Sequence, residues 1–244
     1  MRERILAIGG PGSGKTFGWL KLASYFSKSQ FYVIDSEVGA ERSLQEFPSL
    51  RNVHVYPVID WTEYRKAQKE IGTKATEHDW IVVDMADKMW TAVQRYFISE
   101  VFDKEMGEYF LEARKKVKKD AKSLFAGRDA ALKGWTDWPV VNRLYDDLVF
   151  PLIYRSSANL YMASAAQAVS EDDDKITKDL YGPWGVRPAG QKNLGHQPDT
   201  VLLMMHDKAG YNLTTIKDRG GRKYIERQKL VNFAVQYGKV AGWL

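Results

Sequence analysis

The chain contains no cysteine among its 244 residues, and this absence limits the chemistry that the protein can use. Disulfide bonds and thiolate metal sites are excluded, and a reducing compartment fits the composition. The four histidines lack the spacing of metal ligands, so we expect no structural zinc at His54, His78, His196 or His206. His206 stands beside Asp207 in an expected turn, and we interpret it as a surface residue.

Long hydrophobic runs are also missing. None approaches the roughly 20 residues that a membrane-spanning helix needs, so we expect no membrane partner. The opening sequence MRERILAI leads directly into an apolar segment, which predicts no signal peptide and a cytoplasmic protein, in the host cell if its source is viral. Hydrophobic residues still make up 44% of the chain, too many for a disordered protein. The net charge of +5 permits an anionic partner without requiring one.

The segment Gly9–Thr16, with the sequence GGPGSGKT, matches the phosphate-binding pattern G-x-x-x-x-G-K-[ST] in full. It follows an expected strand, Arg2–Ile8, and precedes an expected helix, Thr16–Phe26. Glycines let backbone N–H groups turn toward phosphate oxygens, and the positive end of the helix points to the same place. The pattern predicts that Lys15 reaches the β- and γ-phosphates of ATP and that the Thr16 hydroxyl binds Mg²⁺.

Nucleotide binding is therefore expected along the whole loop. The residues that we expect to contact ATP are Gly10, Pro11, Gly12, Ser13, Gly14, Lys15, Thr16 and Phe17.

Two later strands end in acidic residues. Phe31–Ile34 is followed by Asp35 and Glu37, and such a buried strand delivers residues to the carboxyl edge of a parallel sheet. Either acid could instead cap the next helix. Trp80–Val83 ends in Asp84, which matches the second acidic motif of phosphate-loop ATPases and would help to hold Mg²⁺.

Residues 90–158 turn helical and charged, and we interpret them as a helical insertion. Within them, Glu112–Lys133 carries eight lysines and arginines against three acids. A solvated helix face and a contact surface for phosphate backbones both explain this composition.

Asn159–Ala165 predicts a fourth core strand that leads to Gln167. A long polar loop is expected at about 168–198, because this stretch is rich in glycine and proline and begins with acidic residues. The segments 199–205 and 211–216 then predict a β-hairpin that ends near Lys217 and Arg219, with a further strand at 223–226.

With these parts in order, the chain resembles the RecA-like P-loop ATPases, and most closely the phage-type RecA-like proteins of single-strand annealing and recombination. The resemblance rests on GGPGSGKT, VIDSE, WIVVD, the strand before Gln167 and IKDR. It implies one α/β domain over 1–244 with a mostly parallel central sheet, helices on both faces and a C-terminal β-hairpin.

The resemblance also implies roles for particular residues. Glu37 would orient the attacking water, Asp84 would hold Mg²⁺, and Gln167 would sense the γ-phosphate, with Ser164 as the alternative. Lys217 and Arg219 would act on the ATP of a neighbouring subunit, although a basic hairpin end or a nucleic-acid contact explains them too.

The expected function is a Mg²⁺-dependent ATPase that acts on single-stranded DNA as a ring or filament. Trp184, Arg187, Lys192 and the stretch Glu112–Lys133 would supply stacking and charge. A helicase or DNA-packaging motor of the same fold, a small-molecule kinase, and a module that binds nucleotide without turnover remain alternatives.

Overall fold

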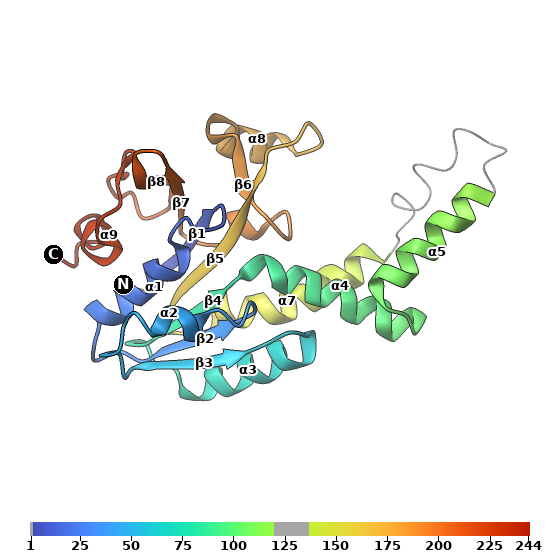
Figure 1. Cartoon of the computed structure of the whole chain (residues 1–244), viewed down its shortest axis with the longest axis horizontal. Helices are drawn as coiled ribbons and strands as arrows, with labels where there is room; N and C mark the ends of the chain where they lie inside the picture. Colours follow the sequence, from blue (N-terminus) through green and yellow to red (C-terminus); the bar gives the residue numbers. More distant parts are fainter. Residues whose placement is uncertain (1, 120–136) are drawn as a thin grey trace.

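The computed structural model describes residues 2–119 and 137–244 and builds them around one mixed β-sheet (Figure 1). In the described part of the chain the strand order is β3-β2-β4-β5-β1-β7-β8-β9, and β6 pairs with the end of β5. The strands are β1 (Arg4–Gly9), β2 (Phe31–Asp35), β3 (Val53–Pro57), β4 (Trp80–Asp84), β5 (Asn159–Ala168), β6 (Val186–Pro188), β7 (Thr200–Asp207), β8 (Gly210–Asp218) and β9 (Gln228–Lys229).

The central strands run parallel, and β7 with β8 forms the antiparallel hairpin that the sequence predicts. Every residue of β2 and β4 is buried, as expected for strands that are covered on both faces. Because parallel strands end at the same edge of a sheet, the ends of β1, β2 and β4 lie together. The predicted α/β fold class is confirmed.

Helices cover both faces of the sheet. The helical segments are α1 (Lys15–Tyr25), α2 (Ala40–Leu44), α3 (Trp61–Lys74), α4 (Ala86–Phe102), α5 (Met106–Lys119), α7 (Trp138–Phe150), the π-helical turn η1 (Pro151–Arg155), α8 (Lys175–Tyr181), the 3-10 turns η2 (Gly182–Trp184) and η3 (Leu194–His196), and α9 (Phe233–Ala241). None of the helices in the described ranges is long and apolar enough to cross a membrane.

The two faces have separate hydrophobic cores. On one face α3, α4 and α7 bury Tyr64, Val93 and Tyr145 against the sheet. On the other face α1 and α9 bury Trp19 and Phe233. Within 90–158, then, α4 and α7 belong to a core layer, whereas α5 packs Met106, Tyr109 and Phe110 against that core and then projects from the body of the molecule (Figure 1).

The stretch 168–198 differs from the long loop that we expect from sequence. It carries α8, η2, β6 and η3, and β5 extends to pair with β6 (Figure 1). Two of its acidic residues explain why this stretch forms regular structure. The Asp174 side chain caps α8 by accepting a hydrogen bond from Thr177 N at 2.8 Å. Asp173 forms an ion pair with Arg187 at 2.8 Å.

The strand expected at 223–226 is wrong. This segment runs beside β8 and is held there by two hydrogen bonds between Ile225 and Thr215. In one of them Ile225 N donates to the Thr215 hydroxyl instead of to the backbone. The last short strand is β9, two residues further on.

Candidate functional site

The loop Gly9–Thr16 turns sharply between β1 and α1, and its geometry requires glycines, Gly9 and Gly14 among them. Gly14 has φ +93°, a left-handed conformation that disfavours other residues, and it stands at the N-terminal end of α1. A Cβ atom on Gly9 would lie 2.2 Å from the carbonyl oxygen of Met204. The glycines therefore set both the turn of the loop and its packing against β7.

Lys15 is buried and folds back over this loop. Its Nζ donates hydrogen bonds of 2.8 Å to the carbonyl oxygens of Gly9 and Gly10 and lies 3.4 Å from Ser13 Oγ. Burial lowers the pKa of Lys15, and the nearby carboxylates of Asp84, Asp87 and Glu37 oppose that shift. The loop thus concentrates a positive charge where a phosphate group would enter.

Thr16 and Asp84 meet as the two sequence motifs predict. The Thr16 hydroxyl donates to Asp84 Oδ2 at 2.9 Å, and the buried indole Nε1 of Trp19 donates to the same oxygen at 2.9 Å. Burial raises the pKa of Asp84, and these two hydrogen bonds act against it. A hydroxyl and a carboxylate are hard oxygen ligands, so this pair fits Mg²⁺.

The two acids at the end of β2, Asp35 and Glu37, have different environments. Asp35 is buried and accepts hydrogen bonds from the backbone N–H groups of Glu37 at 3.1 Å and Ala40 at 2.9 Å, so it shapes the turn after the strand. Glu37 is half exposed, and its Oε1 lies 3.8 Å from Nζ of Lys88 on α4. Of the two, Glu37 is the one that faces the cavity described next.

A cavity of about 710 Å³ opens above the loop. Its polar lining residues include Lys15, Thr16, Glu37 and Asp87, and every residue from Pro11 to Phe17 lines it. Gly10 contributes its carbonyl to Lys15 instead of lining the cavity.

The other wall of the cavity is apolar and comes from the C-terminal part of the chain. It consists of Tyr211, Leu230, Val231 and Phe233. The side chains of Tyr211 and Leu230 reach to within 4 Å of where a Cβ on Gly14 would lie. Sequence reasoning missed these residues because no local pattern marks them. The cavity is large enough for a nucleotide, and its lining combines charged groups with apolar side chains.

Gln167 and Ser164 lie beside the cavity without lining it. The amide of Gln167 is satisfied when its oxygen faces Arg187. The oxygen then accepts hydrogen bonds from the two guanidinium NH2 groups of Arg187, at N···O distances of 2.5 and 2.7 Å. Ser164 Oγ is buried and contacts the carbonyl oxygens of Ala165 and Ala189. The residue of β5 that lines the cavity is Ala165, whose N–H donates to Asp87 at 3.1 Å.

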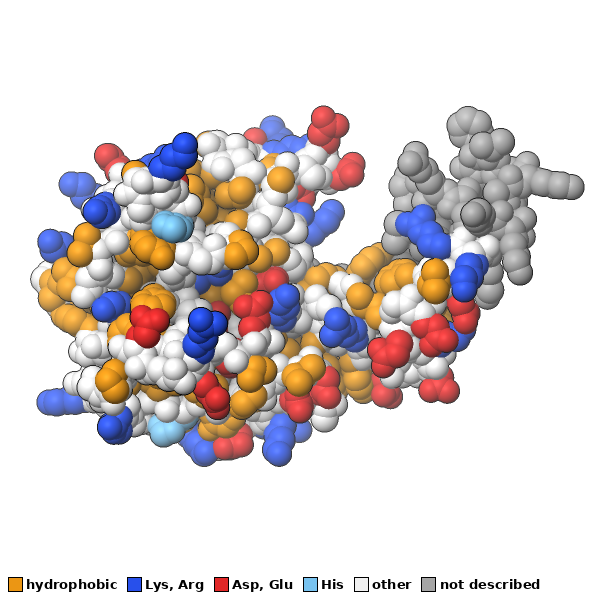
Figure 2. All heavy atoms as spheres, viewed as in Figure 1, with side chains coloured by type: hydrophobic (Ala, Val, Ile, Leu, Met, Phe, Trp, Pro, Cys, Tyr) orange, Lys and Arg blue, Asp and Glu red, His pale blue; other side chains and the backbone are white. Residues whose placement is uncertain are grey.

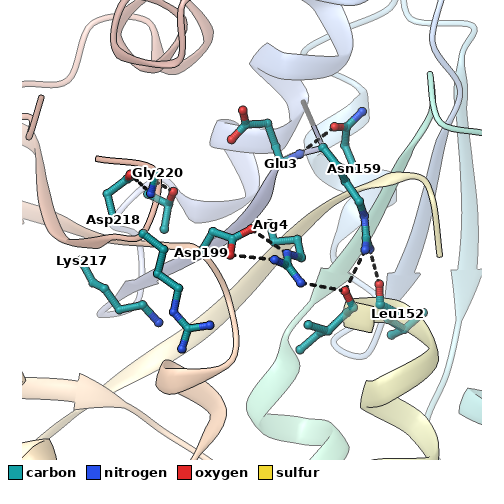
Figure 3. Close-up of polar contacts among 12 residues, drawn as sticks. Glu3, Arg4, Leu152, Asn159, Asp199, Lys217, Asp218 and Gly220 are labelled. Atoms are coloured by element: carbon teal, nitrogen blue, oxygen red, sulfur yellow. Dashed lines mark hydrogen bonds and ion pairs between the residues drawn. The ribbon is translucent and has the colours of Figure 1, made fainter. Parts of the chain in front are cut away.

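Lys217 and Arg219 lie at the opposite edge of the sheet from the loop, because β8 runs antiparallel to β7 and ends beside the start of β1. Lys217 Nζ donates to the carbonyl oxygens of Gly195 and His196 at 3.0 and 3.1 Å, and Arg219 donates to His196 O at 2.6 Å. Figure 3 shows Lys217 at this edge together with the ion pair of Arg4 and Asp199, which are 2.6 Å apart.

Burial and, to a smaller extent, the charge of Arg219 lower the pKa of Lys217 to about 8, while Asp199 opposes the shift. Because Lys217 and Arg219 lie at the edge of the sheet opposite the phosphate-binding loop, they cannot reach the loop of their own chain.

The residues expected to contact DNA are in varied settings. Arg187 is partly buried and engaged in its ion pair with the buried Asp173, whereas Trp184 and Lys192 are exposed. Arg114 and Lys115 on α5 are exposed too, and residues 120–133 of the basic stretch lie outside the described residues. On the face drawn in Figure 2, basic and acidic side chains are interspersed, with no continuous basic field. His206 is exposed and stacks on Tyr211, which confirms it as a surface residue.

The sheet order, the glycine loop after β1 and the acid at the end of β4 define a RecA-like fold. A solved structure with this fold, the crystal structure of the RadB recombinase, is similar to the chain at a TM-score of 0.52. The identity is 11%, and the match covers 94% of this chain and 88% of that chain. No family model matches the chain, and no curated protein matches it in sequence.

Proposed function

We propose that the chain is a Mg²⁺-dependent ATPase of the RecA-like class that acts on single-stranded DNA in recombination, annealing or replication. The observation that carries the proposal is the hydrogen bond from Thr16 to the buried Asp84, beside a cavity that Lys15, Thr16 and Glu37 line. On the order of its sequence motifs, we propose that the chain is most similar to the phage-type annealing proteins. We also propose that it acts in the cytoplasm.

Each residue has a role in phosphoryl transfer. Lys15 binds the β- and γ-phosphates, and Thr16 with Asp84 would hold Mg²⁺, which when bound neutralises charge that develops on phosphate oxygens. Glu37 is half exposed at the cavity, and its ion pair with Lys88 is loose at 3.8 Å, so its carboxylate would be able to turn toward a water molecule and orient it. Gln167 lies two residues after Ala165 on β5. Its side chain would need to turn away from Arg187 to act as a sensor of the γ-phosphate.

Assembly is the second part of the proposal. Because Lys217 and Arg219 lie at the edge of the sheet opposite the loop, they can act only on the ATP of a neighbouring subunit in a ring or filament. A cation placed on the transferred phosphate accelerates hydrolysis by roughly 10³ to 10⁵. In the single chain, Lys217 and Arg219 donate hydrogen bonds to the backbone carbonyl oxygens of residues 195 and 196. These hydrogen bonds would hold the two cations in place until a neighbouring subunit binds.

The test is the rate of ATP hydrolysis with and without single-stranded DNA, measured beside the molecular mass in solution. We expect Mg²⁺-dependent turnover that rises with DNA and with protein concentration. Phosphate transfer to a small-molecule acceptor by a monomer, without release of inorganic phosphate, would favour the kinase instead.

A further inference from the structure

A second cavity, of about 420 Å³, lies next to the nucleotide cavity. It is formed where the turn after β2, the segment after β3 and the face of α4 meet, and its lining includes Ser36, Glu37, Ile59, Lys88, Thr91 and Arg95. It stands at the carboxyl edge of the sheet, on the same side as the phosphate-binding loop.

The α4 side of this cavity is suited to a phosphate group. Lys88, Thr91 and Arg95 are three and four residues apart, so they share one face of the helix and present two cations and a hydroxyl. Arg95 is exposed and makes no hydrogen bond or ion pair within the part of the chain that the structure describes. Its guanidinium is therefore available to a phosphodiester, which it would bind by a charge-assisted hydrogen bond.

Lys88 connects the two cavities. Both cavities are lined by Lys88 and by Glu37, and the two side chains form an ion pair with an N···O distance of 3.8 Å. The pair is loose and half exposed, so a second anion beside Lys88 can compete with Glu37 for the ammonium group.

We propose that the second cavity binds a backbone phosphate of single-stranded DNA between Lys88 and Arg95, and that this contact draws Lys88 away from Glu37. The inference rests on the proposed ATPase function, and it adds the place where the strand binds and the way in which binding reaches the site of hydrolysis. Without DNA, Lys88 holds Glu37; with DNA, Glu37 turns to the attacking water.

DNA binding is measured first, by the fluorescence anisotropy of a labelled oligothymidylate over a range of salt concentrations. Arg95→Ala should weaken binding roughly three- to tenfold and lower the salt slope by about 0.7, the value for one lost phosphate contact on a single strand. Arg95→Lys should keep the slope, because it keeps the charge. The matched control is Arg51→Ala, which removes an exposed arginine just before β3, at the other edge of the sheet.

ATP hydrolysis is measured next, with and without the same oligonucleotide. Lys88→Gln should raise the rate without DNA by up to about fivefold, which corresponds to the energy of one exposed ion pair, and it should remove most of the stimulation by DNA. Arg95→Ala should keep the rate without DNA and require more DNA for the same stimulation. Inorganic phosphate in place of the oligonucleotide should not stimulate hydrolysis.

The outcomes separate this inference from the proposed function. Unchanged DNA affinity and salt slope in Arg95→Ala, or full stimulation in Lys88→Gln, would overturn the inference and leave the ATPase in place. Stimulation by inorganic phosphate alone would replace the DNA strand by a small anion and overturn it too. An absence of ATP hydrolysis under every condition would overturn the proposed function and, with it, the link to Glu37, while the anisotropy result still decides where DNA binds.

Discussion

Trp19→Phe is a small change that should have a specific effect on the Mg²⁺ site. The substitution keeps a large aromatic ring in the core under α1 but removes the indole N–H that donates to Asp84 Oδ2 at 2.9 Å. Among the described residues, Asp84 is then left with one side-chain donor, Thr16, where it had two. A hydrogen bond to a charged group contributes about 1.5–3 kcal/mol, and loss of a group that orients a metal ligand typically costs 10- to 100-fold in metal affinity.

We therefore expect Trp19→Phe to shift the Mg²⁺ concentration at half-maximal ATP hydrolysis upward by about tenfold or more. Mn²⁺ binding in the presence of a non-hydrolysable ATP analogue, followed by electron paramagnetic resonance, should show the same loss. The matched control is Trp61→Phe, since the indole nitrogen of Trp61 is buried without a hydrogen-bond partner in the described part of the chain. Equal metal affinity in Trp19→Phe and the unmutated protein would refute the idea that Trp19 orients Asp84.

Three further predictions concern Lys15, Glu37, Arg219 and Lys217. Lys15→Ala should abolish ATP turnover, whereas Glu37→Gln should still bind ATP in a filter assay and hydrolyse it very slowly; normal hydrolysis by Glu37→Gln would remove Glu37 from its role. Arg219→Ala subunits should regain turnover when mixed with Lys15→Ala subunits, and no recovery in demonstrated co-assemblies would contradict a shared site. Because the pKa of Lys217 is lowered to about 8, the unfolded chain binds more protons above that pH, so stability rises with pH there. From pH 7 to 9 the unmutated protein should gain about 1 kcal/mol in unfolding free energy relative to Lys217→Met, after allowance for partial exposure; a constant difference in chemical denaturation would contradict this.

The sequence predicted those parts of the site that follow from strand order. Thr16 and Asp84 could be placed together because each follows a buried strand, and parallel strands end at one edge. Trp19 could not be assigned to Asp84, because its position in the apolar pattern of α1 indicates only a core residue.

Other features depend on contacts between segments that are distant in sequence. The partner of Gln167 is set by the register of β5 with β6, and β6 lies in a stretch whose composition favours a loop. Likewise, the bonds of Lys217 and Arg219 to the carbonyls of 195–196 depend on how η3 packs beside β8. The apolar wall of the cavity is formed by Tyr211, Leu230, Val231 and Phe233, which are distant from Gly14 in sequence. Tyr211 and Leu230 come close to Gly14 only after the chain has folded.

The central claim is that Thr16 and Asp84 form the Mg²⁺ site of an ATPase, and its most direct test is the initial rate of ATP hydrolysis as Mg²⁺ is titrated. We compare the unmutated protein with Thr16→Ala and Asp84→Asn, each checked for an unchanged fold by circular dichroism. The unmutated protein should show saturable, Mg²⁺-dependent turnover that chelation with EDTA abolishes, and both variants should lose that turnover. Hydrolysis that persists in EDTA, or that both variants retain at the same Mg²⁺ concentration, would contradict the assignment of this site.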